Sequence, residues 1–162
     1  MHLELWLAFV AAAIVLLAIP GPTILTVISY SASHGKRATL PLIAGVALGD
    51  STALFLSLVG LGDLLAASAL WFSVVKWAGG LYLLFLGVRM LRAGASAQVA
   101  AAAPAPESLR RLFLNTYAVT ALNPKGMVFF VAFLPQFLNS SASAAPQLWA
   151  LGVTFVALAA IN

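Results

Sequence analysis

The chain has 162 residues, of which 63% are hydrophobic and only 7% are charged. A soluble domain carries about 25% charged residues, so this composition is that of a polytopic membrane protein and not of a soluble enzyme or binding module. The net charge of +4 comes from basic residues that lie mostly at the ends of apolar runs, which argues against a nucleic-acid partner, and the absence of cysteine excludes disulfides, thiolate metal sites and cysteine nucleophiles.

The first apolar segment, expected over Leu3–Ser31, is interrupted by Pro20-Gly21-Pro22. The two prolines lack a backbone N–H, and the glycine between them is free to leave helical geometry. One interpretation is a kink at a helix end. The interpretation we favour is a discontinuous membrane helix whose freed backbone groups, with Thr23, meet a substrate. A cleaved signal peptide is disfavoured because Met1–Ala18 contains no Lys or Arg.

The next segment, expected over Leu40–Leu61, carries an acidic residue near its middle. A charge at that depth costs roughly 2.5–3.5 kcal/mol or more unless it faces a partner or a cavity, so we expect Asp50 on the inner face of the helix bundle. Gly45 and Gly49 stand four residues apart, a spacing that lets two membrane helices approach closely. We expect these two glycines to pack helices and not to bind a ligand.

A third segment, expected over Ala69–Leu91, contains Gly79-Gly80 and Gly87, which predict a second packing face. Residues 93–108 are rich in alanine and contain two prolines, without apolar periodicity. This composition predicts a flexible linker between two halves of the chain.

The fourth segment, Leu112–Leu138, is long enough to cross a bilayer, which requires roughly 20 apolar residues. Its centre nevertheless reads Asn123-Pro124-Lys125, which combines a helix breaker, a polar amide and a full positive charge. A charged residue at membrane depth is a functional-site hypothesis by default. A fifth segment follows from Gln147 to Asn162.

The distribution of basic residues predicts the orientation in the membrane. Under the positive-inside rule, the loops at 32–39 and 92–111 are cytoplasmic and the N-terminus lies outside. The second and fourth loops carry no Lys or Arg, and the tryptophans fall in the outer halves of their segments. The basic residues concerned are Lys36, Arg37, Arg89, Arg92, Arg110 and Arg111.

The two interruptions occupy corresponding places in the two halves of the chain. Broken helices in such places are the best sequence indication of a transporter built from inverted repeats. We therefore predict one all-α membrane domain over residues 1–162, with a first repeat at about 1–92, a linker at 93–108 and a second, inverted repeat at 109–162. Two three-helix repeats would need six spans, and five are expected here.

Four motifs in order resemble the LysE/RhtB amino-acid exporters: Ile19-Pro20-Gly21-Pro22, Gly45-Val46-Ala47-Leu48-Gly49-Asp50, the glycine-rich stretch from Lys76 to Gly87, and Leu122-Asn123-Pro124-Lys125 through Phe133-Leu134-Pro135-Gln136-Phe137. The resemblance implies a six-span protein of the cell inner membrane. It also implies efflux of amino acids, often neutral ones such as homoserine or threonine, driven by the proton motive force. The chain departs from the family pattern at Thr23, Thr116 and Thr120, positions that bear on the substrate.

The mechanistic hypothesis joins the two interruptions. Backbone groups at Pro20–Pro22 and at Asn123-Pro124 would bind the ammonium and carboxylate of an amino acid, with Lys125 providing charge for the carboxylate. Asp50 would be the counter-charge or the proton carrier. The alternative is a static ion pair between Asp50 and Lys125 that only holds two helices together. The partners expected are an amino acid, protons and the lipid bilayer, with no metal and no cofactor, and a homo-oligomer is left open.

Two other classes of protein are alternatives to an exporter. Gly60-Leu61-Gly62-Asp63 matches a short motif of membrane aspartyl proteases, whose two carboxylates must lie ~3 Å apart. The other aspartate, Asp50, would lie ~20 Å away along the same helix, so an enzyme is not expected. A non-transporting membrane subunit or an inactive truncated fragment is the remaining alternative.

Overall fold

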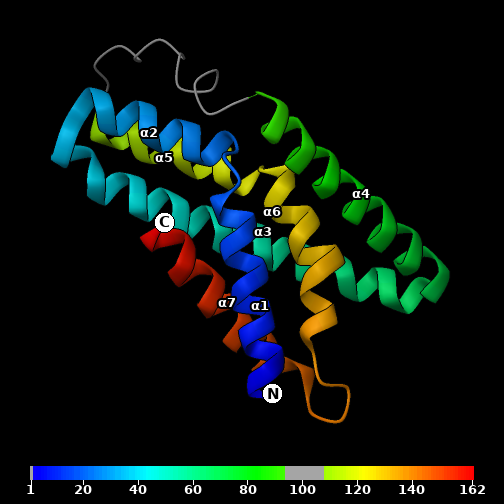
Figure 1. Ribbon diagram of the computed structural model, residues 1–162. Coiled ribbons are helices and arrows are strands. Elements are labelled where there is room, and N and C mark those ends of the chain that lie inside the picture. The colour runs from blue at the N-terminus through cyan, green and yellow to red at the C-terminus, as the bar shows by residue number, and fades with distance from the viewer. Residues whose placement is uncertain (1, 94–107) are drawn as a thin grey trace.

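The computed structural model describes residues 2–93 and 108–162, and all the regular structure in these ranges is helical (Figure 1). The first range contains α1 (Leu3–Ala18), α2 (Pro22–His34), the 3-10 turn η1 (Gly35–Ala38), α3 (Thr39–Ala67) and α4 (Ala69–Ala93). The second range contains α5 (Leu109–Ala121), α6 (Pro124–Val128), the π-helical turn η3 (Phe129–Phe133), the 3-10 turn η4 (Leu134–Phe137) and α7 (Ala144–Ile161). The predicted all-α fold is confirmed, whereas most of the expected linker and the loop at 92–111 lie outside the described residues.

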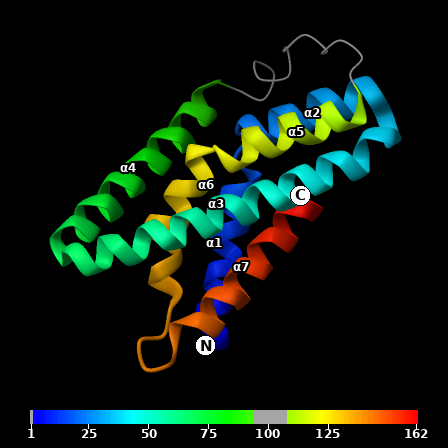
Figure 2. The same ribbon diagram turned by 180° about the vertical axis from the view of Figure 1, so that it is seen from behind.

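Four segments of the described chain are long and apolar enough to cross a membrane, namely Pro22–Gly60, Leu70–Arg89, Leu109–Phe137 and Ala144–Ile161. Helix α1 is a shorter apolar helix of 16 residues. The segment predicted as one interrupted helix over Leu3–Ser31 is therefore divided between α1 and α2, which leave the break in different directions (Figures 1 and 2). The predicted multi-pass helical membrane architecture is confirmed.

Both interruptions follow from the steric rule for a residue that precedes proline. Ile19 precedes Pro20 and has ψ 110°, and Asn123 precedes Pro124 and also has ψ 110°. Proline Cδ disfavours helical ψ at the preceding residue and directs it to the extended region. Each helix therefore ends before the proline, and a new helix begins with a proline at its first position, where no amide donor is needed.

Helices α3 and α5 run side by side in the same direction, and both views show α2 alongside α5 (Figures 1 and 2). Two glycines of α3 make this approach close. A Cβ built on Gly45 would lie 2.9 Å from Thr116 Cβ, and one built on Gly49 would lie 2.6 Å from Thr120 Cβ. The two pairs are four residues apart on each helix, so they form one continuous line of contact.

The three glycines of α4 that were expected to pack against other helices have different surroundings. A Cβ on Gly79 would lie 2.8 Å from Ala132 Cβ, so this residue does pack against the second half of the chain. Gly80 and Gly87 meet no described residue within 4 Å, so helix packing against these two glycines stays a prediction. Gly80 is one residue on from Gly79 and points to a different side of the helix, and α4 keeps most of its large apolar side chains exposed.

The interior of the bundle is aromatic where α1, η3 and α7 meet. Phe9 and Phe129 have ring centroids 5.9 Å apart, and Phe130 packs edge-on against Phe155 at 4.7 Å. Phe9 also contacts Phe137 edge-on at 5.4 Å. We call these five residues the aromatic cluster; its tilted and edge-on geometries are those that aromatic pairs prefer.

Candidate functional site

The two helix interruptions meet, although more than a hundred residues separate them in sequence. The Lys125 Nζ, in the first turn of α6, donates hydrogen bonds to the Leu16 carbonyl at 3.0 Å and to the Ile19 carbonyl at 2.7 Å. These carbonyls belong to the last turn and the C-cap of α1. The Leu16 carbonyl also accepts from the Ile19 backbone N–H at 3.2 Å, whereas the Ile19 carbonyl lies beyond the last helical residue, where acceptors lack intrahelical donors. A cation there is stabilised by the helix dipole as well as by the hydrogen bonds. Lys125, only 7% exposed, thus joins α6 to the end of α1.

Polar side chains hold the second interruption against the start of α2. The Asn123 Oδ1 accepts from the Lys125 backbone N–H at 3.1 Å and so caps α6. The Asn123 Nδ2 donates to Thr23 Oγ1 at 3.1 Å, and the Thr120 hydroxyl donates to the same oxygen at 3.3 Å. Thr23 therefore accepts hydrogen bonds from both sides of the break in the second half of the chain.

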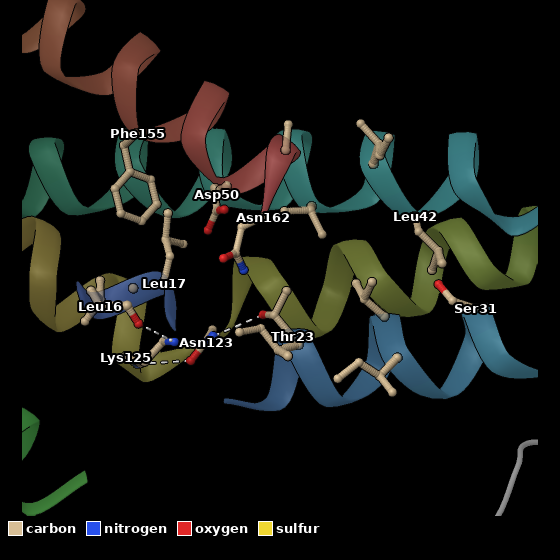
Figure 3. Close-up of a pocket in the computed structure, with 18 of the residues that line it drawn as sticks. Leu16, Leu17, Thr23, Ser31, Leu42, Asp50, Asn123, Lys125, Phe155 and Asn162 are labelled. Atoms are coloured by element: carbon tan, nitrogen blue, oxygen red, sulfur yellow. Dashed lines mark hydrogen bonds between the residues drawn. The ribbon is translucent and has the colours of Figure 1, made fainter. Parts of the chain in front are cut away.

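Asp50 points into the same space from α3 (Figure 3). It is 8% exposed, and within the described chain it has no hydrogen-bond donor and no ion pair. Lys125 attracts it through space, but the ammonium makes its direct bonds to the α1 carbonyls. The static ion pair considered as an alternative is therefore absent from this structure. A buried carboxylate without a protein partner is suited to binding a cation or a proton.

A cavity of about 300 Å³ connects these groups (Figure 3). Its polar end consists of Thr23, Asp50, Asn123 and Lys125, and Asn162 also lines it. From there the cavity continues between α2 and α3 to the ends of these helices, and its wall is mostly apolar. The volume is at the lower limit of known ligand pockets, which fits a small molecule.

Four of the residues predicted for the pathway line this cavity, and four do not. Thr23, Asp50, Asn123 and Lys125 lie together as described, whereas the wall does not include Pro20, Gly21, Pro22 or Pro124. These four residues shape the breaks: the prolines end and start helices, and a Cβ on Gly21 would lie 3.4 Å from Lys125 Cε and Nζ.

Sequence reasoning missed the acceptors of the lysine and the role of Thr120. Backbone carbonyls carry no sequence signal, so the bonds from Lys125 to Leu16 and Ile19 could not be found. Thr116 and Thr120, however, repeat the four-residue spacing of Gly45 and Gly49, and this match could have indicated the contact between the two segments.

No group of three His, Asp or Glu that could hold a metal ion occurs in the described ranges.

Comparison with known proteins finds a matching family model and several similar bacterial proteins. The family model for the LysE type translocator matches residues 14–161. The chain is 35% identical to an uncharacterized membrane protein of Vibrio cholerae over 99% of its own length and 78% of the relative. It is 35% identical to a homoserine/homoserine lactone efflux protein of Salmonella typhimurium over 96% of its length and 75% of the relative.

A leucine efflux protein of Klebsiella pneumoniae is 29% identical over 85% of the chain and 65% of the relative. No solved structure matches the chain. The relatives with assigned activities are efflux proteins, which points to a transporter and away from an enzyme.

Proposed function

Because the chain belongs to the LysE type translocator family, we propose that it exports neutral α-amino acids across the bacterial inner membrane in exchange for protons. The observation that carries this proposal is the buried, unpartnered Asp50 facing a cavity where two broken helices meet. Discontinuous helices that surround a small polar site are the arrangement by which many secondary transporters bind their substrates.

The polar end of the cavity offers complementary groups for a zwitterion. Asp50 would receive the substrate ammonium, since it is the acidic residue in the wall. The substrate carboxylate would lie toward Asn123 and Lys125. A lysine ammonium has three donors, and two of these bind the Leu16 and Ile19 carbonyls, which leaves one for the carboxylate.

Exchange of the amino acid for a proton would follow from the presence of one acidic side chain, Asp50, in the cavity wall. A substrate ammonium and a proton both neutralise Asp50, and binding of one excludes the other. Each exported amino acid would then be replaced on Asp50 by a proton from outside, and release of that proton into the cytoplasm would restore the site. The proton gradient would thereby drive export.

The predicted orientation supports entry of the substrate into the cavity from the cytoplasm. The cavity extends from the two breaks to Ser31 and Thr39, next to the loop at 32–39 that we expect to be cytoplasmic. The aromatic cluster packs tightly on the other side of the breaks, around Phe9 and Phe129. With the N-terminus outside, the cavity would be reached from the cytoplasm and closed from the exterior.

Transport by the purified chain in proteoliposomes tests this function. Vesicles loaded with a labelled neutral amino acid should release it faster when a proton gradient is imposed from outside to inside. Asp50→Asn should abolish the acceleration by the gradient while the protein still folds and inserts. Glu4→Gln is the matched control, because Glu4 is an exposed acid outside the cavity.

Three results would contradict the proposal in different ways. Failure to move any amino acid would favour a non-transporting membrane protein. Transport that ignores the pH gradient in the wild type would remove the proton from the mechanism. Loss of folding in Asp50→Asn, with Glu4→Gln unaffected, would indicate that Asp50 stabilises the fold and does not carry the proton.

A further inference from the structure

The wall of the cavity becomes apolar one helical turn away from its polar end. Val27 follows Thr23 by four residues on α2, and Val46 precedes Asp50 by four residues on α3. Residues four apart lie on the same helix face about 6 Å along the axis. Both valines line the cavity, and Val46 is only 7% exposed. The two helices thus present a pair of branched apolar side chains at the same level.

The neighbouring wall that α2 and α3 contribute within about one helical turn of the valines is also apolar. Ile24 and Ile43 line the cavity beside the two valines. The other hydroxyls of the wall, Ser31 and Thr39, lie eight residues beyond Thr23 and eleven residues before Asp50, or about 12 Å and about 16 Å along their helices. A short side chain whose α-carbon sits at the polar end cannot reach them.

We propose, building on the exporter function above, that Val27 and Val46 form the subsite for the substrate side chain and select apolar amino acids of valine to leucine size. A hydroxyl placed between these valines would lose its hydrogen bonds to water without gaining a side-chain partner from α2 or α3. The hydroxylated side chains of threonine and homoserine, expected from the family resemblance, are disfavoured at this subsite.

The size of the preference is limited by the nature of the subsite. An apolar pocket rejects a side chain of equal shape that carries a hydroxyl by at most about a hundredfold. Valine and threonine are such a pair, so their competition isolates the effect of the hydroxyl. We expect the ratio of transport efficiencies for valine over threonine to lie between about tenfold and a hundredfold.

Competition between labelled valine and labelled threonine in proteoliposomes measures this ratio. In Val46→Thr the ratio should fall by about tenfold, because the new hydroxyl offers a partner to the substrate hydroxyl. Val59→Thr is the matched control: it makes the same change on the same helix, at a residue that is 53% exposed and outside the cavity wall. The control should leave the ratio unchanged.

A second variant tests the shape of the subsite without introducing a polar group. Val46→Ala enlarges the subsite and should raise the efficiency for leucine relative to valine several-fold. Thermal unfolding in detergent identifies any variant that fails to fold, and the wild-type ratio needs no variant at all.

Preference of the wild type for threonine or homoserine would overturn the subsite while leaving the exporter function intact. The subsite would also be overturned if folded Val46→Thr kept the wild-type ratio of valine to threonine transport and folded Val46→Ala kept the wild-type ratio of leucine to valine transport. Absence of transport of any amino acid would overturn both proposals together.

Discussion

Replacing Gly49 with alanine tests the close contact between α3 and α5. The added Cβ would lie 2.6 Å from Thr120 Cβ and 3.0 Å from both Thr120 Cγ2 and the Tyr117 carbonyl oxygen. Non-bonded carbon atoms prefer separations of about 3.5–4.0 Å, so the two helices would have to move apart by about 1 Å. Overpacking of this kind costs about 1–3 kcal/mol of unfolding free energy.

Gly60→Ala is the matched control for this substitution. Gly60 lies on the same helix, and a Cβ added there meets no described residue within 4 Å. Both substitutions gain the same helix propensity, about 1 kcal/mol for glycine to alanine in a helix interior. That gain cancels in the comparison, so Gly49→Ala should be less stable than Gly60→Ala by about 1–3 kcal/mol.

Reversible unfolding in detergent, followed by circular dichroism, measures the difference. The double variant Gly49→Ala with Thr120→Gly removes the Cβ that is struck and should recover part of the loss, which identifies the contact as the cause. Equal stability of Gly49→Ala and Gly60→Ala would refute the reasoning, because it would mean that α3 and α5 are not in contact at this position.

Three further substitutions test the joined helix breaks and the bundle. Lys125→Gln should lower the unfolding free energy by about 1.5–3 kcal/mol for each bond lost to an α1 carbonyl, measured against the exposed control Lys36→Gln in the same unfolding assay. Asn123→Ala removes the cap of α6 and should cost about 1 kcal/mol in the same assay, and no loss would show that the cap is dispensable. Trp6→Phe removes the hydrogen bond from Trp6 Nε1 to Thr154 Oγ1, 3.1 Å, and should cost about 0.5–1.5 kcal/mol; Thr154→Val should cost a similar amount, and additive losses in the double variant would contradict a direct bond.

Much of the fold could be predicted from the sequence, because it depends on the lipid bilayer and on steric contacts between neighbouring residues. Only helices and closed barrels satisfy the backbone in lipid, and apolar runs of about 20 residues are typical of helices, so the all-α membrane fold was predictable from the sequence. Contacts with the proline ring disfavour helical geometry at the residue before it, so the breaks at Pro20 and Pro124 were also predictable. The burial of Asp50 and Lys125 followed from the cost of placing a charge against lipid.

The pairing of these features depended on distant parts of the chain. Leu16 and Lys125 are 109 residues apart, and the carbonyl that accepts the lysine's hydrogen bond has no side-chain signal. Gly49 and Gly80 likewise give the same signal in the sequence, yet one touches α5 and the other touches no described residue. The sequence by itself determined where helices begin, where they break and which charges must leave the lipid, because each is decided within one or two turns of chain. Only the tertiary structure decided which helix faces meet and which acceptors bind the buried charges, because helix packing brings together groups that the linear order keeps apart.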